Sequence, residues 1–312
     1  MRQIEILINN YPVRIMLAQG NAKPKVACLG PEGTYTEAAR HQLLGSYLKS
    51  MEANFLPYNA TVVQKVEAGD YDIGIVPVEN AIEGDVVEVL RELKHTKETN
   101  ILGETILGIQ HMLIGQPEAR LEEIKEVHSH PQALAQCRAY LLTHCPKAIQ
   151  KNASSTAAAV ELVKENSRVA AIASRRAAEI SNLPILAEDI GDIKGNSTRF
   201  ILLGRGETLS TGQDSTALIF VPREDRPGIL ADCLTVLKLY DINLTKLDSR
   251  PTGKMREYEM WLTLDGHIQD SNVSQALNLL DTRYCASLRV LGSYRKAIIP
   301  QGVKDPGVIN GQ

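Results

Sequence analysis

The sequence is poor in aromatic residues, has few cysteines and contains no long apolar run. Phe, Trp and Tyr make up 4% of the 312 residues, so the core must rest mainly on Val, Ile, Leu and Ala. The five cysteines lie far apart, form no Cys-x-x-Cys pair and are odd in number. This pattern is typical of reduced, buried thiols rather than of a disulfide framework or a zinc site. We therefore expect a cytoplasmic protein.

Charge and hydropathy exclude two further classes of protein. The net charge is −3 and no long basic stripe occurs, which argues against a nucleic acid as the main partner. No run approaches the roughly 18 apolar residues of a membrane span. The short apolar stretch at residues 4–8 is interrupted by Glu5, unlike a secretory signal. With 44% apolar and 23% charged residues, the chain is typical of a globular protein of about two domains.

Residues 24–206 alternate short apolar runs with helical periodicity, which is the pattern of an α/β fold. Strands are expected at residues 25–29, 72–76, 124–128, 169–173 and 200–203. Helices are expected to begin near Tyr35, Asp85, Pro131 and Ser174, and Glu88 completes a possible capping box after Asp85. The mostly apolar run 101–114 is long enough to cross between two lobes. Two such lobes would leave a cleft, where small ligands usually bind.

A second domain is expected after a linker at residues 207–213, where Gly, Ser and Thr are frequent. Residues 214–295 predict the order strand, helix, strand, strand, helix, strand, which is the ferredoxin-like arrangement. The strand at residues 258–264 alternates apolar and polar side chains and is expected to be half-buried. Residues 1–23 are interpreted as an N-terminal extension and residues 296–312 as a loose tail.

Two motifs place polar side chains directly after predicted strands. Asn80 could donate a hydrogen bond to a carboxylate or hydroxyl group, and Glu79 could orient a neighbour. His130 could act as a general acid or base. Both motifs are also compatible with an ordinary turn or helix cap.

Two further motifs lie where helices begin. Gly33 and Thr34 belong to a Gly-rich turn whose exposed backbone N–H groups favour an anion. Thr156 belongs to a Ser/Thr-rich helix start that could bind a carboxylate in the same way. Plain N-terminal caps would have much the same sequence.

The most informative motif is the polar loop at residues 188–200, which runs directly into an apolar strand. It contains Asn196 and ends in Thr198, Arg199 and Phe200. An arginine at the mouth of a buried strand has no evident structural reason. A planar guanidinium there could hold a carboxylate through two parallel hydrogen bonds.

Taken in order along the chain, these motifs resemble the prephenate dehydratase family. The catalytic region looks like that family at GPEGTYTEAA, PVENAIEG, HSHPQALAQC, SSTAAA and GNSTRFILLG. The resemblance implies two lobes similar to a periplasmic binding protein. The rest looks like the family's ACT regulatory domain at DRPGIL, INLTKLDSRP, LDGH and LGSY. It also implies that the chain converts prephenate into phenylpyruvate, water and CO₂ without a metal or organic cofactor, as a step in phenylalanine biosynthesis.

The resemblance implies roles for residues of the catalytic region. Thr198 would donate a hydrogen bond to the departing hydroxyl group, Arg199 would clamp a substrate carboxylate, and Phe200 would pack beside the ring. The residues expected to bind and orient prephenate are Gly33, Thr34, Glu79, Asn80, Thr156 and Asn196. Ala81 stands where the family usually has serine, which removes one possible hydrogen bond to the substrate.

The ACT resemblance implies feedback regulation by L-phenylalanine at an interface between two subunits, and hence a homodimer or homotetramer. The residues expected to form this pocket are Gly228, Ile229, Leu230, Asp248, Ser249, Arg250 and Pro251. Without the family, the same residues are equally compatible with ordinary turns. Asp248 replaces the family's usual glutamate, which leaves the effector and its affinity open.

Two other functions remain compatible with these motifs. An arogenate dehydratase would use the same mechanism on the amino-acid analogue of prephenate. A non-catalytic, amino-acid-sensing binding protein would need Arg199 but not the hydrogen-bond donor Thr198 beside it. The first 24 residues are too few for a helical chorismate mutase domain, so a single activity is expected.

Overall fold

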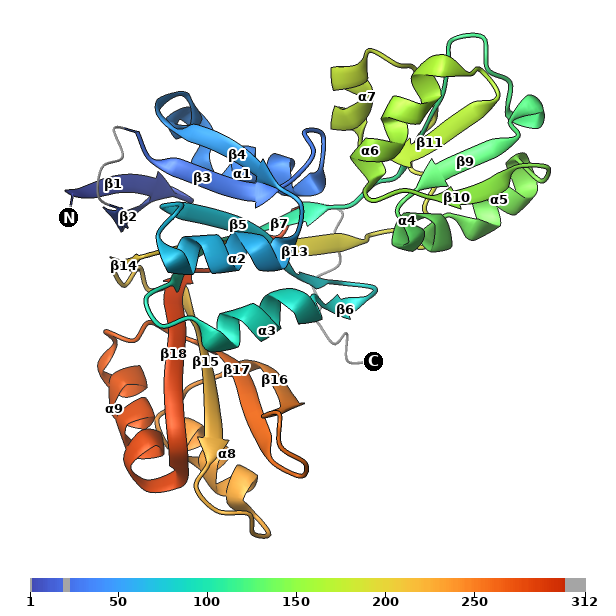
Figure 1. Cartoon of the computed structure of the whole chain (residues 1–312). Coiled ribbons are helices and arrows are strands. Elements are labelled where there is room, and N and C mark those ends of the chain that lie inside the picture. Colours follow the sequence, from blue (N-terminus) through green and yellow to red (C-terminus); the bar gives the residue numbers. More distant parts are fainter. Residues whose placement is uncertain (1, 19–22, 301–312) are drawn as a thin grey trace.

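The structure is a computed structural model, in which residues 2–18 and 23–300 are described. It comprises two α/β lobes and a C-terminal domain. Figure 1 shows the C-terminal domain packed beneath the first lobe, while the second lobe extends to one side. No helix within these residues is long and apolar enough to cross a membrane. The part of the expected tail beyond residue 300 lies outside the described residues.

The first lobe is built on a mixed six-stranded sheet with helices on both faces. The strand order is β4-β3-β5-β13-β7, and the short β6 pairs with β5. The strands are β3 (Lys25–Leu29), β4 (Glu52–Leu56), β5 (Ile73–Asn80), β6 (Gly84–Asp85), β7 (Asn100–Gly108) and β13 (Ser197–Gly204). The helices are α1 (Tyr35–Leu44), η1 (Gly45–Ser50), α2 (Asn59–Ala68) and α3 (Val87–His95). Apolar residues of α1 pack on one face of this sheet, and those of α2 and α3 pack on the other.

Strand β13 has both faces buried, and its side chains alternate between two cores. Phe200 and Leu202 belong to the core beneath α1, whereas Ile201 and Leu203 belong to the core beneath α2 and α3. This alternation follows from the two-residue period of a β-strand. Neighbouring residues of β13 therefore point to opposite sides of the first lobe.

The expected strand at residues 72–76 continues beyond Pro77 to Asn80. Pro77 lacks an N–H group to donate to a neighbouring strand, and the register between β5 and β13 shifts here, between Arg199 and Phe200. Such an irregularity is where a sheet accommodates proline. The extra residues carry Asn80 alongside the start of β13.

The N-terminal segment forms a hairpin of β1 (Arg2–Ile8) and β2 (Tyr11–Leu17). β2 also pairs with β14 (Gly206–Thr208), which gives a three-stranded antiparallel sheet. Ile15 is 0% exposed because alternate side chains of β2 pack on the core beneath α1. Residues 2–17 therefore belong to the first lobe, and part of the expected linker is a strand of the same lobe.

The second lobe is built on a five-stranded sheet of order β10-β9-β11-β8-β12. Its strands are β8 (Met112–Ile114), β9 (Glu126–Ser129), β10 (Ile149–Asn152), β11 (Val169–Ala173) and β12 (Ile185–Ala187). Its helices are η2 (Leu121–Glu123), α4 (Pro131–Gln136), α5 (Arg138–His144), α6 (Thr156–Glu161), η3 (Leu162–Glu165) and α7 (Arg175–Ser181). Two crossings join the lobes, one from β7 to β8 and one from β12 to β13 (Figure 1). The first is the crossing that the run 101–114 predicts.

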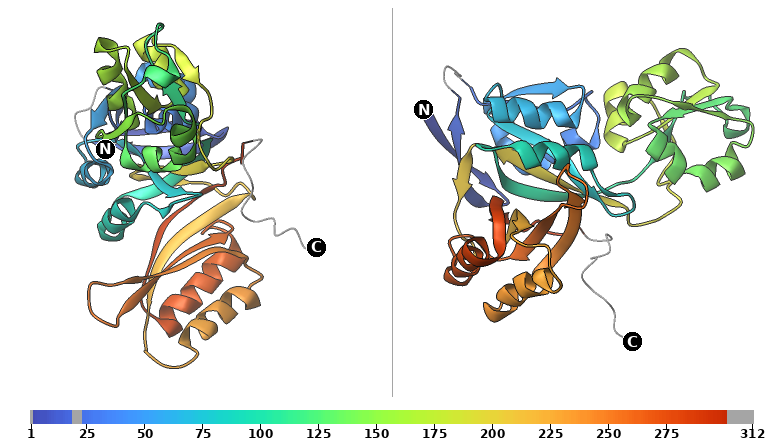
Figure 2. Two further views of the ribbon diagram at one scale, coloured as in Figure 1. Left: turned by 90° about the vertical axis from the view of Figure 1, so that its right-hand side faces the viewer. Right: turned by 60° about the horizontal axis from the view of Figure 1, so that its bottom comes forward.

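The C-terminal domain has the predicted order of elements and a four-stranded antiparallel sheet of order β16-β17-β15-β18. Its strands are β15 (Asp214–Pro222), β16 (Leu244–Pro251), β17 (Tyr258–Asp265) and β18 (Cys285–Arg295). Its helices are α8 (Ile229–Leu239), α9 (Ser271–Leu279) and η4 (Leu280–Tyr284). Figure 2 shows α8 and α9 on the face of the sheet that is turned away from the first lobe.

The opposite face of this sheet packs against the first lobe, so β17 is buried on both faces instead of one. Trp261 is 8% exposed and Glu259 is 4% exposed, and Trp261 shares a core with Leu90 of α3 and Ile201 of β13. The chain is also closely packed at Gly292 of β18. A Cβ atom at Gly292 would lie 2.1 Å from the carbonyl oxygen of Ile101, so only glycine fits there.

Candidate active site where the two lobes meet

The centre of the site is a hydrogen bond between the ends of two neighbouring strands. Asn80, the last residue of β5, lies directly opposite Thr198 of β13. Its Nδ2 donates to Thr198 Oγ1 at 2.9 Å and to Asn196 Oδ1 at 3.0 Å. Its Oδ1 accepts from the backbone N–H groups of Ile82 and Glu83. Because Thr198 Oγ1 accepts from Asn80, its own proton remains for another acceptor.

Gln136, at the end of α4, connects this cluster to the second lobe. Its Oε1 accepts from Asn196 Nδ2 at 3.1 Å, and its Nε2 donates to Glu83 Oε1 at 3.1 Å. His111 Nε2 lies 2.9 Å from the same Oε1 atom, and since that oxygen can only accept, Nε2 carries the proton. Gln136 therefore holds together residues from both lobes.

His111 is the one imidazole in this hydrogen-bonded cluster. It is 5% exposed, its Nδ1 has no hydrogen-bond partner, and burial lowers its pKa below the usual 6.5. The imidazole of His111 is therefore neutral, and its Nδ1 is a buried acceptor without a donor among the described residues. The sequence motif HSHPQALAQC contains Gln136, but the sequence gives no local signal for Gln136 or His111, because their partners lie far away in the sequence.

The site is closed in this conformation. Thr198, Asn80 and Asn196 are 8%, 7% and 5% exposed, because the lobes are in contact where a cleft is expected. Separation of the lobes would open a path for a ligand to the hydroxyl group of Thr198. Two lobes joined by two crossings are suited to such a hinge motion.

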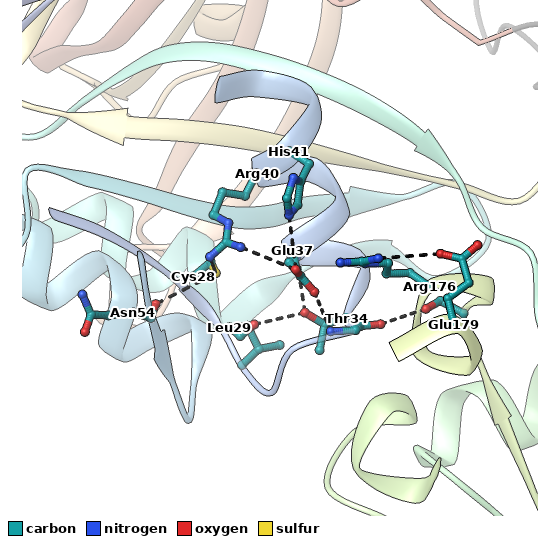
Figure 3. Close-up of polar contacts among 11 residues, drawn as sticks. Cys28, Leu29, Thr34, Glu37, Arg40, His41, Asn54, Arg176 and Glu179 are labelled. Atoms are coloured by element: carbon teal, nitrogen blue, oxygen red, sulfur yellow. Dashed lines mark hydrogen bonds and ion pairs between the residues drawn. The ribbon is translucent and has the colours of Figure 1, made fainter. Parts of the chain in front are cut away.

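The predicted turn at Gly33 and Thr34 is held by Glu37, a buried residue of α1 (Figure 3). The Glu37 carboxylate accepts from the N–H of Gly33 at 2.5 Å and binds His41 Nε2 at 3.2 Å. Thr34 Oγ1 in turn accepts from the Glu37 N–H at 3.3 Å. This reciprocal arrangement is a variant of the capping box. In this conformation the Gly33 N–H and the Thr34 side chain thus bind their own helix.

The same turn touches the second lobe. Ser174 Oγ of the α7 cap donates to the Gly33 carbonyl oxygen at 2.8 Å. A Cβ atom at Gly33 would lie 3.2 Å from Ala177 and 3.6 Å from Ala157, and Gly33 has a φ of 89°. Both the positive φ and the close approach explain why glycine stands here. The turn is therefore a second contact between the lobes.

Arg199 lies on the opposite side of β13 from Thr198. Its Nε and Nη2 bind Glu79 Oε2 at 3.1 and 3.0 Å, and its Nη1 binds Glu104 Oε2 at 3.1 Å. Burial alone would lower its pKa, but the charges of Glu104 and Glu79 outweigh that and raise it. The expectation that Thr198 and Arg199 face one cleft together is contradicted by these contacts, because successive side chains of a strand alternate.

Phe200 is 2% exposed and packs in the core beneath α1 with Leu43 and Ile75. It is not placed to cover a ligand ring in this conformation. His130 accepts from the N–H of Gln132 and caps α4. Thr156 is the first residue of α6, which Ser155 caps through its hydroxyl group. The expected capping box at Asp85 does not form, since Asp85 binds side chains of the C-terminal domain.

The candidate pocket residues of the C-terminal domain form two separate groups. Gly228, Ile229 and Leu230 lie where α8 begins, whereas residues 248–251 lie on β16, an edge strand. Among the described residues, no hydrogen bond or ion pair joins the two groups. Residues 2–18 and 23–300 also contain no group of three His, Cys, Asp or Glu side chains that could hold a metal ion.

Comparison with known proteins yields consistent matches. The family model for prephenate dehydratase matches residues 26–208. The bifunctional chorismate mutase/prephenate dehydratase of Aquifex aeolicus is 36% identical over 282 residues, covering 89% of this chain and 75% of that protein. The prephenate dehydratase of Mycolicibacterium vanbaalenii is 34% identical, covering 87% of this chain and 91% of its own. The solved structure of prephenate dehydratase from Arthrobacter aurescens in complex with L-Phe matches with a TM-score of 0.79 and 36% identity over 87% of this chain and 90% of that one.

Proposed function

Because the chain belongs to the prephenate dehydratase family, we propose that Thr198, held by Asn80, is the group at which prephenate loses its hydroxyl. The family makes the protein a lyase. The observation that carries the assignment of the site is the 2.9 Å hydrogen bond from Asn80 Nδ2 to Thr198 Oγ1. It fixes the hydroxyl group of Thr198 as a donor toward whatever binds beside it.

The reaction requires little from the enzyme beyond substrate binding, orientation and one hydrogen bond. The bond from the ring to its carboxylate breaks and CO₂ leaves, the electron pair moves through the ring, and the C–O bond to the hydroxyl group breaks. With one proton from solvent the hydroxide leaves as water, and phenylpyruvate remains. Aromatisation drives these steps, so a donor at the departing oxygen is the main catalytic need. Threonine is a poor acid, so Thr198 stabilises the leaving oxygen rather than giving up its proton.

Prephenate carries two carboxylates, and Arg199 is bound by Glu79 and Glu104. We assign a carboxylate to Arg176 of α7 instead. Its neighbour Ala177 packs on Gly33, and in Figure 3 the Arg176 side chain runs from α7 towards Glu37. Arg176 is 46% exposed and its pairing with Glu179, at 3.7 Å, is loose. Its guanidinium is therefore available to a ligand that enters between the lobes.

We assign regulation by L-phenylalanine to residues 214–295, with residues 24–206 as the catalytic part. Support comes from the βαββαβ order of the domain and from the relative that was solved with L-Phe bound. Residues 228–230 and 248–251 do not meet within one chain, and β16 is an edge strand that a second copy could pair with. A pocket shared between two subunits of a homodimer therefore fits this placement.

The direct test is to mix the purified protein with prephenate and follow phenylpyruvate, with and without L-phenylalanine. Arogenate is offered in a parallel reaction and in competition. The proposal expects phenylpyruvate from prephenate and less of it with L-phenylalanine. A protein that binds prephenate without turning it over would be a binding protein, and faster turnover of arogenate would make it an arogenate dehydratase.

A further inference from the structure

A chain of ion pairs crosses the contact between the first lobe and the C-terminal domain. We call it the interdomain ion network, and its members are Arg199, Glu79, Lys246, Asp85, Arg250 and Asp248. Lys246 of β16 stands at its centre, because its Nζ contacts Glu79 Oε1 at 3.1 Å and also Asp85 Oδ1. Arg250, four residues further along β16, binds Asp85 Oδ2 at 2.5 Å, and its Nε lies 2.8 Å from Asp248 Oδ2 without hydrogen-bond geometry.

The centre of the network is partly shielded from water, whereas the side chains of Glu79 and Asp248 are each 37% exposed. The side chains of Asp85, Lys246 and Arg250 are 14%, 26% and 21% exposed, so salt screens them less than surface pairs. Burial tends to raise the pKa of Asp85, yet Lys246 and Arg250 lower it overall. A partly open cavity of about 40 Å³ borders Asp85, Lys246 and Trp261. This cavity is large enough for a water molecule beside Asp85 and Lys246.

The network holds both ends of the segment that carries Asn80. Glu79 precedes Asn80 directly, and Asp85 lies on β6 just after the turn at residues 82–83, whose N–H groups bind Asn80 Oδ1. Glu83 of the same turn binds Gln136 of the second lobe. A change at either carboxylate therefore reaches the residue that positions Thr198.

The other end of the network lies among the residues assigned to the effector. An amino acid brings one ammonium and one carboxylate group, which compete for Asp248 and Arg250 respectively. When Arg250 turns to a ligand, Asp85 loses one of its two cations, and Lys246 is drawn from Glu79 towards Asp85. This shift weakens the ion pair between Lys246 and Glu79 without any contact between effector and substrate.

We propose that Lys246 is a positioning residue for the dehydratase site, and that it transmits amino-acid binding at Asp248–Arg250 to Asn80 through Glu79 and Asp85. The inference rests on the proposed function, because it needs an effector in the C-terminal domain. It adds a residue beyond those assigned to the effector pocket, and a route between two sites. Allosteric coupling requires such an element with two arrangements that both ligands bias.

The test uses the full chain with Lys246→Met, and with Lys246→Arg as the conservative variant. Lys254→Met is the matched control, because Lys254 belongs to the same domain and its side chain is 82% exposed. Within the described residues its one ion pair is with Glu257. Binding of L-phenylalanine is followed by calorimetry and by the emission of Trp261, the single tryptophan, which lies at the domain contact. Inhibition is measured as the ratio of kcat/KM without and with saturating L-phenylalanine.

The expected result is that Lys246→Met still binds L-phenylalanine while the inhibition ratio falls to about one. Its kcat without effector also falls, with KM for prephenate little changed, because Lys246 does not touch the substrate. Lys246→Arg restores inhibition, and Lys254→Met behaves as the unchanged protein. If Lys246→Met does not fold, the same measurements are made on Asp85→Asn, which breaks the same route.

Two results overturn the inference and are distinguishable. In the first, Lys246→Met or Asp85→Asn binds L-phenylalanine and is inhibited as fully as the unchanged protein. The network would then not connect the two sites, while the proposed function stands. An unchanged protein that converts prephenate but neither binds nor responds to L-phenylalanine removes the effector site, and the network's role with it.

Discussion

Thr198 and Arg199 are consecutive residues of β13, and their side chains serve two different interfaces. Thr198 accepts a hydrogen bond from Asn80 where the two lobes meet. Arg199 binds Glu79 and Glu104 on the side of the sheet that faces the C-terminal domain. One strand therefore carries the proposed chemistry on one face and the interdomain contact on the other. The two residues can be tested separately, because replacing Thr198 should lower turnover whereas replacing Arg199 should lower stability.

Replacing Thr198 by Val keeps the volume of the side chain and removes the proposed donor. We expect kcat to fall by about 10²–10³-fold, the usual effect of losing one transition-state hydrogen bond, with little change in the unfolding midpoint. Thr105→Val is the matched control, since Thr105 lies on the neighbouring strand β7 and is 1% exposed. Steady-state phenylpyruvate formation measures both variants. Near-normal turnover of Thr198→Val would remove this residue from the mechanism.

Replacing Arg199 by Met should act on stability rather than on substrate affinity. The change leaves the carboxylates of Glu79 and Glu104 without their shared cation, and breaking a buried pair in this way costs about 3–5 kcal/mol. Urea unfolding measures that loss, and adding Glu104→Gln to Arg199→Met should recover part of it. A stable Arg199→Met variant with a strongly raised KM would show instead that Arg199 binds the substrate.

Replacing Arg176 by Met tests the carboxylate assignment. Loss of a charge-assisted hydrogen bond of about 1.5–3 kcal/mol should raise KM for prephenate by about 10–150-fold. Arg175→Met is a close control, since Arg175 is the preceding residue, is 48% exposed and pairs with Glu188 at 2.8 Å. Equal kinetics for the two variants would mean that another group meets the carboxylate.

The sequence predicts best what depends on local patterns. β3 spans residues 25–29 as predicted, and α1 begins at Tyr35 as predicted, because an apolar run and a helical period are properties of adjacent residues. The βαββαβ order of the C-terminal domain follows from the same signals. Strand alternation also predicts that the side chains of Thr198 and Arg199 point to opposite faces, whereas the family resemblance implies that both act on one substrate.

The remaining errors come from contacts between distant parts of the chain. Asp85 has the sequence of a helix cap, yet the cations of β16 take its carboxylate, a tertiary interaction that overrides a local preference. Gln136 escapes notice because its partner Asn196 lies 60 positions away in the sequence. Trp261 lies on a face that alternation assigns to solvent, and only the packing of the two domains buries it.

The buried imidazole of His111 should make stability depend on pH. Its pKa in the folded protein lies below 6.5, whereas in the unfolded chain it is about 6.5. The unfolded state therefore binds more protons as the pH falls below that value, and the stability present above it is lost.

Replacing His111 by Gln keeps a donor for Gln136 and removes this titration. Thermal unfolding at pH 7.5 and 5.5 should show a smaller difference for His111→Gln than for the unchanged protein, and an identical difference would contradict the assignment. His267 is also buried with a lowered pKa, so part of the dependence should remain.

Replacing Gly292 by Ala tests how the C-terminal domain is held against the first lobe. The added Cβ would lie 2.1 Å from the carbonyl oxygen of Ile101, a backbone atom that cannot rotate away, so β18 and β7 must separate. Overpacking of this kind costs about 1–3 kcal/mol, and the separation should expose Trp261 and shift its emission to longer wavelength. Gly191→Ala is the control, because the nearest atom to its Cβ would be 3.7 Å away. Since the interdomain ion network spans the same contact, Gly292→Ala should also weaken inhibition by L-phenylalanine. Unchanged emission together with an unchanged unfolding midpoint would mean that the two strands do not approach each other so closely in solution.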